Sequence, residues 1–99
     1  MQIINNKTRN ELKLYNEATF ELFYLLAAKL ESKMLINFDS KIDDFDELFW
    51  TFKYKNQQMI LNYSTFDGIS IYKRGNNLNN EQDEIYILQE IKNEIQKII

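Results

Sequence analysis

Two neighbouring segments alternate between apolar and polar residues, and this alternation constrains the fold more than any other feature of the chain. Residues 49–54 and 58–63 each carry their largest apolar side chains at every second position, which is the period of a β-strand with one buried face. Between them, Lys55-Asn56-Gln57 fits a hairpin turn with Asn56 at a positive φ. Residues 69–72 alternate as well, so the sequence predicts a three-stranded antiparallel meander. The shared apolar face consists of Trp50, Phe52, Tyr54, Met59, Leu61 and Tyr63.

Two longer segments repeat apolar residues with the spacing of an α-helix. Residues 17–32 place Phe20, Phe23 and Leu30 on one stripe, with Asn16 as the expected N-cap. Residues 81–97 carry a second stripe, and acidic residues stand near the expected N-terminus, where the helix dipole favours them. The second stripe consists of Ile85, Leu88, Ile91, Ile95 and Ile98.

The remaining segments complete the expected fold. Residues 11–15 predict a short first strand, residues 34–38 fit a strand or a loop, and residues 1–10 fit a loose or edge segment. Because the chain has no repeat and no linker, we expect one domain over residues 1–99. The predicted fold class is α+β: an antiparallel sheet of about four strands with two helices packed on one face, in the order β-α-β-β-β-α.

The composition limits the compartment and the partners that we expect. Cys is absent, so the disulfide framework of many small secreted domains cannot form. The longest apolar run, residues 22–28, is far shorter than the roughly 20 residues of a membrane span. We therefore expect a soluble, cytoplasmic protein that binds no membrane. The net charge of −3 and the pI of about 4.9 disfavour nucleic acid and favour a basic protein partner.

The residue types exclude most catalytic chemistry. Without His or Cys, the chain lacks the common general base near neutral pH, the thiolate nucleophile and the ordinary zinc ligands. Its two glycines, Gly68 and Gly75, cannot build a phosphate-cradling loop or a dinucleotide fingerprint. Carboxylate catalysis stays formally open, because Asp and Glu are plentiful. We expect a non-catalytic protein without a cofactor.

The most charged segment is Asp39–Glu47, which holds five acidic residues and one lysine. It lacks the central glycine and the ligand spacing of a calcium loop, so we expect no metal site. Two interpretations remain: a solvated loop in which Asp43 or Asp46 caps a turn, or a patch that receives a basic partner around Ile42 and Phe45. In the second interpretation the partner-binding residues are Asp39, Asp43, Asp44, Asp46 and Glu47.

Two apolar surfaces also leave alternatives open. The aromatic face of the meander fits the core of the sheet, or else an exposed platform on which bases stack beside Lys53 and Lys55. The helix predicted over residues 17–32 is apolar nearly all round, which fits deep burial or a contact with a partner. In the second case Leu22, Tyr24 and Leu25 would form a homodimer contact.

The meander resembles a pattern found in small, uncharacterised single-domain bacterial proteins. The similarity covers roughly residues 42–72 and is carried by Trp50-Thr51-Phe52-Lys53-Tyr54, Ile60-Leu61-Asn62-Tyr63 and Asp67-Gly68-Ile69-Ser70-Ile71. Some of those proteins look like immunity partners of secreted bacterial toxins. The resemblance supports the fold more than a function. The missing catalytic residues and the acidic segment favour a small acidic binding protein of the toxin-immunity kind, which would cover a site on a basic partner. The alternative is a homodimeric structural or regulatory domain.

Overall fold

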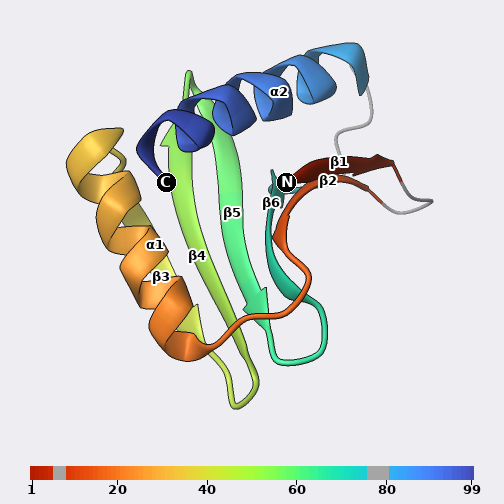
Figure 1. The fold of residues 1–99 in the computed structure, drawn as a ribbon. Coiled ribbons are helices and arrows are strands. Elements are labelled where there is room, and N and C mark those ends of the chain that lie inside the picture. Colours follow the sequence, from red (N-terminus) through yellow and green to blue (C-terminus); the bar gives the residue numbers. More distant parts are fainter. Residues whose placement is uncertain (6–8, 76–80) are drawn as a thin grey trace.

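The computed structural model describes residues 1–5, 9–75 and 81–99, and shows an α+β fold in which two helices lie over one face of a six-stranded antiparallel sheet (Figure 1). Residues 6–8 of the predicted segment 1–10, and residues 76–80 before the second helix, lie outside the described part of the chain. In chain order the elements are β1 (Gln2–Asn5), β2 (Asn10–Tyr15), α1 (Phe20–Lys33), β3 (Phe38–Asp43), β4 (Glu47–Tyr54), β5 (Gln57–Ser64), β6 (Gly68–Lys73) and α2 (Glu81–Ile98).

The strands lie in the order β1-β2-β6-β5-β4-β3, and every neighbouring pair is antiparallel. The predicted meander is confirmed as β4, β5 and β6. Its first turn consists of Lys55 and Asn56, whose φ values of 48° and 67° give the two left-handed residues that a tight two-residue hairpin requires. β2 then pairs with β6 across the sheet, so the N-terminal segment completes a sheet that the meander begins.

The prediction of about four strands in the order β-α-β-β-β-α is wrong: the order is β-β-α-β-β-β-β-α. The two missed strands, β1 and β3, are the edges of the sheet. Edge strands have one neighbour and are mostly exposed here, so neither carries the alternation that marks a half-buried strand. Residues 39–43 therefore belong to a strand and not to an irregular loop. This strand, β3, begins at Phe38, which is the last residue of the strand or loop predicted over residues 34–38.

The first helix begins three residues later than predicted. Thr19, and not Asn16, is the N-cap: its backbone is extended, and its Oγ1 accepts a hydrogen bond of 3.1 Å from the amide of Leu22. The preceding residues cross from β2 to the helix, and the hydroxyl of Tyr63 donates to the carbonyl of Ala18 at 3.2 Å. Tertiary packing of this connection thus fixes the start of α1.

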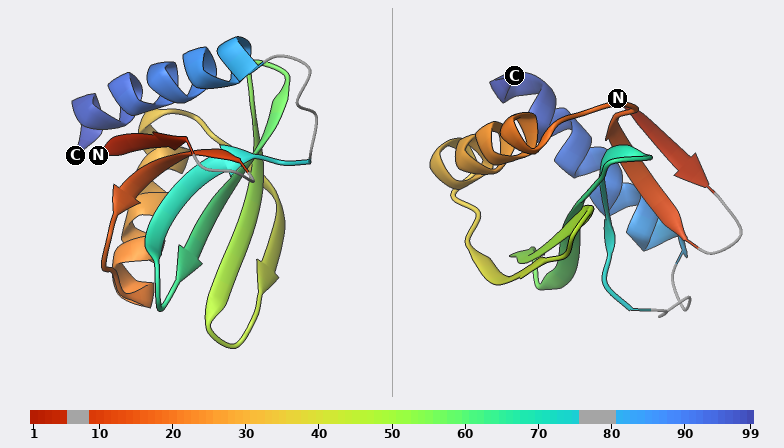
Figure 2. Two further views of the ribbon diagram at one scale, coloured as in Figure 1. Left: turned by 90° about the vertical axis from the view of Figure 1, so that its right-hand side faces the viewer. Right: turned by 90° about the horizontal axis from the view of Figure 1, so that it is seen from below.

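The core lies between the sheet and the helices, as two further views show (Figure 2). α1 contributes Phe23, Leu26 and Leu30, and α2 contributes Leu88, Ile91 and Ile95, all of them buried. On the sheet, the predicted aromatic face is buried apart from the half-buried Tyr54, so it is core and not a stacking platform. The indole of Trp50 packs edge-on against Phe23, with ring centroids 5.0 Å apart, and against Phe38 at 5.3 Å.

Gly68 begins β6 at a point where two chain segments come too close for any side chain. Its φ is +81°, and a Cβ at this position would lie 2.0 Å from the carbonyl oxygen of Tyr15 and 2.7 Å from the carbonyl carbon of Asn16. Both neighbours are backbone atoms, so they cannot turn aside as a flexible side chain could. The contact places the end of β2 directly against the start of β6.

Replacing Gly68 with alanine is expected to destabilise the protein by more than about 2 kcal/mol, because it adds a backbone clash to the strain of a positive φ. The matched control is Gly75→Ala: its φ is +89°, but a Cβ there meets no described atom within 4 Å. That variant should lose only about 1 kcal/mol, from backbone strain alone. Urea unfolding of both proteins measures the difference, and equal losses would show that the approach to Tyr15 is not a constraint.

Candidate functional site

Two turns at one end of the sheet carry fully exposed aromatic side chains. The turn between β3 and β4 presents Phe45, which is 96% exposed, and the turn between β5 and β6 presents Phe66, which is 82% exposed. The amide of Thr65 donates a hydrogen bond of 3.1 Å to the carbonyl of Asp46, so the two turns are in direct contact. Both lie at the lower end of the molecule in Figure 1, beside the first turn of α1. We call residues 44–46 and 65–67 the aromatic tip.

The aromatic tip is also acidic. Asp44, Asp46 and Asp67 contribute three carboxylates, and none of its six residues is Lys or Arg. The predicted partner-binding acids are only partly brought together here. Asp44 and Asp46 lie in the tip, whereas Asp39 stands near the start of β3, about 16 Å from Asp44 at the usual rise of a strand. Asp67 was not predicted, because it is far from the acidic segment in sequence.

Asp43 has a structural contact that the sequence did not reveal. Its Oδ1 accepts a hydrogen bond of 2.8 Å from the indole nitrogen of Trp50. Lys41 lies on the same face of β3, with its Nζ 4.4 Å from the centre of the Trp50 ring. Asp43 and Lys41 therefore hold the outer edge of the Trp50 side chain, and the carboxylate of Asp43 is directed toward the sheet.

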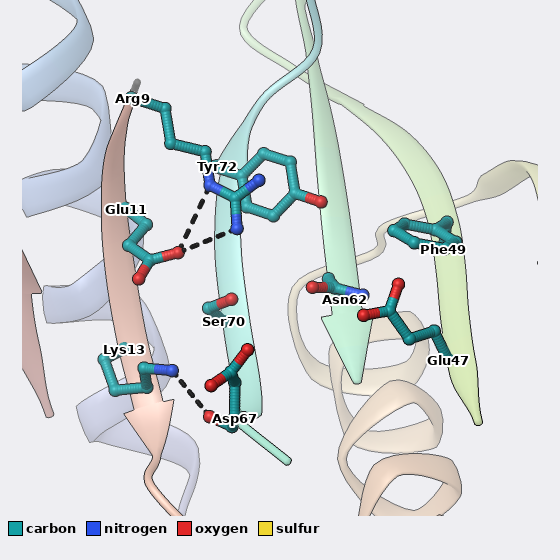
Figure 3. Close-up of a pocket in the computed structure, with 9 residues that line it drawn as sticks. All are labelled: Arg9, Glu11, Lys13, Glu47, Phe49, Asn62, Asp67, Ser70 and Tyr72. Atoms are coloured by element: carbon teal, nitrogen blue, oxygen red, sulfur yellow. Dashed lines mark hydrogen bonds and ion pairs between the residues drawn. The ribbon is translucent and has the colours of Figure 1, made fainter. Parts of the chain in front are cut away.

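Beside the tip, the face of the sheet that the helices leave uncovered has a hollow of about 280 Å³ (Figure 3). β2 and β6 form one side of it, and β4 and β5 form the other. The residues alternate with core residues along their strands, so the hollow and the core lie on opposite faces. Its lining consists of Arg9, Glu11, Lys13, Glu47, Phe49, Asn62, Asp67, Ser70 and Tyr72.

Both positively charged side chains around the hollow already have partners. The guanidinium of Arg9 lies 3.1 Å from the Oε2 of Glu11 and covers the ring of Tyr72, with its central carbon 3.6 Å from the ring centroid. Lys13 donates from its Nζ to the backbone carbonyl of Asp67. Burial raises the pKa of Tyr72; the nearby Arg9 lowers it, and the carboxylate of Glu47 raises it further. Tyr72 therefore keeps its hydroxyl proton at neutral pH.

The predicted dimer residues on α1 divide between two sides of the helix. Tyr24 is 46% exposed, and its ring packs against that of Trp50 with centroids 5.8 Å apart. Leu22 and Leu25 instead line a small hollow of about 50 Å³ together with Tyr15 and Ile99. Leu25 is 57% exposed and Leu22 is half-buried against the core. Tyr24 thus contacts Trp50, whereas Leu22 and Leu25 lie at the small hollow.

Two further properties follow from the described residues. No described helix is both long enough and apolar enough to cross a membrane. Within residues 1–5, 9–75 and 81–99, no three acidic side chains gather in a way that could hold a metal ion. The candidate sites among the described residues are the aromatic tip, with its exposed rings, and the hollow beside it.

Replacing Asp43 with alanine is expected to destabilise the protein by about 1 kcal/mol, because the indole nitrogen of Trp50 loses its acceptor. The adjacent substitution Asp44→Ala removes the same charge but no side-chain hydrogen bond that the structure shows, and should change stability by less than about 0.5 kcal/mol. Urea unfolding followed by Trp50 fluorescence compares the two. If both variants unfold like the parent, the contact between Asp43 and Trp50 contributes nothing to stability.

The geometry of the tip and the hollow can be set against known proteins. The chain was compared with protein-family models, with curated proteins and with solved structures, and none of the three comparisons gave a match.

Proposed function

We propose that the protein is a small non-catalytic binding domain that holds a basic protein partner through its aromatic tip. The observation that carries the proposal is the exposure of Phe45 and Phe66, two aromatic side chains on adjoining turns with carboxylates beside both. Aromatic side chains in a polar surround are the usual energetic centre of a protein interface.

The exposed rings supply affinity once a partner covers them. A phenylalanine side chain has about 150–250 Å² of surface to bury, and each Å² removed from water contributes about 25 cal/mol before the costs of association. Neither ring is needed for the core of this protein, since both project from turns. Their exposure is thus better explained by an intermolecular contact than by folding.

The three carboxylates of the tip supply selectivity. Asp44, Asp46 and Asp67 surround the rings with negative charge, which speeds the approach of a basic surface and opposes an acidic one. A basic bacterial toxin is one partner of this kind, because some of the small bacterial proteins that the meander resembles look like toxin-immunity partners. In that role the protein would cover the toxin's site and would need no catalytic group of its own.

Binding is expected to depend on both features of the tip in different ways. Asp44→Asn, Asp46→Asn and Asp67→Asn combined should slow association and reduce its salt dependence, because exposed charges act over about 8–10 Å at physiological ionic strength. Phe45→Ala and Phe66→Ala should each raise Kd roughly tenfold or more, mainly through faster dissociation. The measurement is of association and dissociation rates at several salt concentrations. The partner is the protein encoded by the gene next to the one that encodes this chain.

Matched substitutions away from the tip serve as controls. The combination Asp39→Asn, Glu31→Gln and Glu94→Gln removes the same amount of charge elsewhere, and Leu35→Ala removes an apolar side chain that is as exposed as Phe66. These proteins should bind at the parental rates. A partner that binds the tip variants and the controls equally well must use another surface, and the proposal would then be wrong.

A second candidate is a homodimer formed through α1, which the exposure of Leu25 beside the small hollow favours. In a two-fold dimer, Leu25 of each protomer would face the hollow of the other, because such an interface uses the same patch twice. This arrangement needs Leu22 and Leu25 but leaves Tyr24 on the side toward Trp50.

If this dimer forms, light scattering at micromolar concentration should give about twice the chain mass of 12.0 kDa. Leu25→Glu should then yield a folded monomer, because it places a charge in an apolar contact. Tyr24→Glu tests the other side of the helix. A parent protein that stays monomeric at high concentration would exclude the homodimer and leave the tip as the only proposed contact.

A further inference from the structure

Two largely buried polar residues, Ser70 and Asn62, form the floor of the hollow on the uncovered face of the sheet. Ser70 is only 4% exposed, and its hydroxyl makes no hydrogen bond within the described part of the chain. Asn62 is 7% exposed, and its Nδ2 donates to the carbonyls of Leu48 at 2.9 Å and Tyr63 at 3.3 Å. These two bonds fix the orientation of the amide, so its Oδ1 is directed away from them and toward Ser70 (Figure 3).

Two carboxylates that line this hollow, those of Glu47 and Asp67, make no ion pair with the described residues. Arg9 pairs with Glu11, and Lys13 donates to the backbone of Asp67. Glu47 is half-buried, and its carboxylate has no ion pair and no hydrogen bond with the described residues. In Figure 3 this carboxylate points toward Asn62, across the hollow from Lys13 and Glu11. A half-buried carboxylate without a partner is a favourable neighbour for a cation.

We propose that the hollow binds one cationic group, a guanidinium or a primary ammonium, between the carboxylate of Glu47, the Oδ1 of Asn62 and the Oγ of Ser70. All three oxygens can accept hydrogen bonds, and these cations are donors only. The ring of Phe49 lies beside Glu47 and offers an aromatic surface to a guanidinium. An anion fits less well, because Arg9 is engaged by Glu11 and Tyr72 and Lys13 by the Asp67 carbonyl.

The cation could come from two sources with the same chemistry. A protein that docks on the aromatic tip could insert a lysine or arginine side chain, since Asp67 belongs to the tip and also lines the hollow. A free alkylammonium or guanidinium compound of small size is the other source. The site itself does not depend on the tip having a partner, so it can be tested on the isolated protein.

The test is a titration of the isotopically labelled protein with ethylguanidinium chloride, followed by amide NMR. We expect saturable shifts at Glu47, Asn62 and Ser70 with a Kd of about 1 mM, while sodium chloride at equal concentration leaves these signals in place. Sodium acetate and inorganic phosphate should not shift them either. The proposal is overturned if the cation causes no saturable shift, or if one of the anions binds instead.

Glu47→Gln keeps the shape of the side chain and removes its charge, so it should weaken ethylguanidinium binding at least about tenfold. Ser70→Ala should weaken it severalfold through the lost acceptor, and serves as the decisive variant if Glu47→Gln fails to fold. The control Glu31→Gln removes an exposed charge on α1 and should bind like the parent. Parental affinity in a folded Glu47→Gln or Ser70→Ala protein would overturn the site.

In one source the cationic group is part of a peptide chain, and in the other it belongs to a free small molecule. Acetyl-Leu-Arg-Leu-amide should bind at least as well as ethylguanidinium if the hollow receives a protein side chain, and its shifts should extend to Phe66 and Asp67. A hollow adapted to a free compound should bind this peptide much more weakly than ethylguanidinium. If the Glu47→Gln protein binds both ethylguanidinium and the peptide with the parental affinity, neither source is supported.

Discussion

The pairing of β2 with β6 is the contact on which the rest of the structure depends. It joins the N-terminal segment to the meander, and it requires glycine at position 68, where the backbones of β6 and of Tyr15 and Asn16 meet. On one face the pairing places Leu12 beside Ile71 under the helices. On the other face it places Glu11 beside Tyr72, and so creates one side of the polar hollow. One set of backbone hydrogen bonds therefore builds both the core and a candidate site.

The same sheet separates two kinds of surface with different physical roles. The helix-covered face carries the hydrophobic core, so the burial of apolar side chains there is the main contribution to the stability of the fold. The uncovered face holds buried polar residues such as Asn62 and Ser70, and the amide of Asn62 donates to two backbone carbonyls of the sheet. The turns at one end hold exposed rings that no element of this chain covers. Function is therefore better sought on the uncovered face and at its end than in the core.

Sequence periodicity was reliable where a strand or helix has one buried side. It predicted the meander, the stripe of α2, the burial of Trp50 and the left-handed Asn56, because each follows from local spacing and local turn chemistry. It missed β1 and β3 because an edge strand is defined by its single neighbour and not by its own pattern. It misplaced the cap of α1 because both Asn16 and Thr19 suit an N-cap, and tertiary packing chose between them.

By itself the sequence determined an α+β class, the positions of most elements, the absence of thiol and imidazole chemistry, and a strongly acidic segment. Only the tertiary structure decided that this segment is divided, with Asp43 holding Trp50, Asp44 and Asp46 at the tip, and Glu47 turned to the hollow. It also decided that Asp67 and Phe66 join Asp46 and Phe45, and that Arg9 meets Tyr72. The reason is physical: side-chain spacing along a chain fixes the face a residue occupies, whereas its neighbours on that face come from strands distant in sequence.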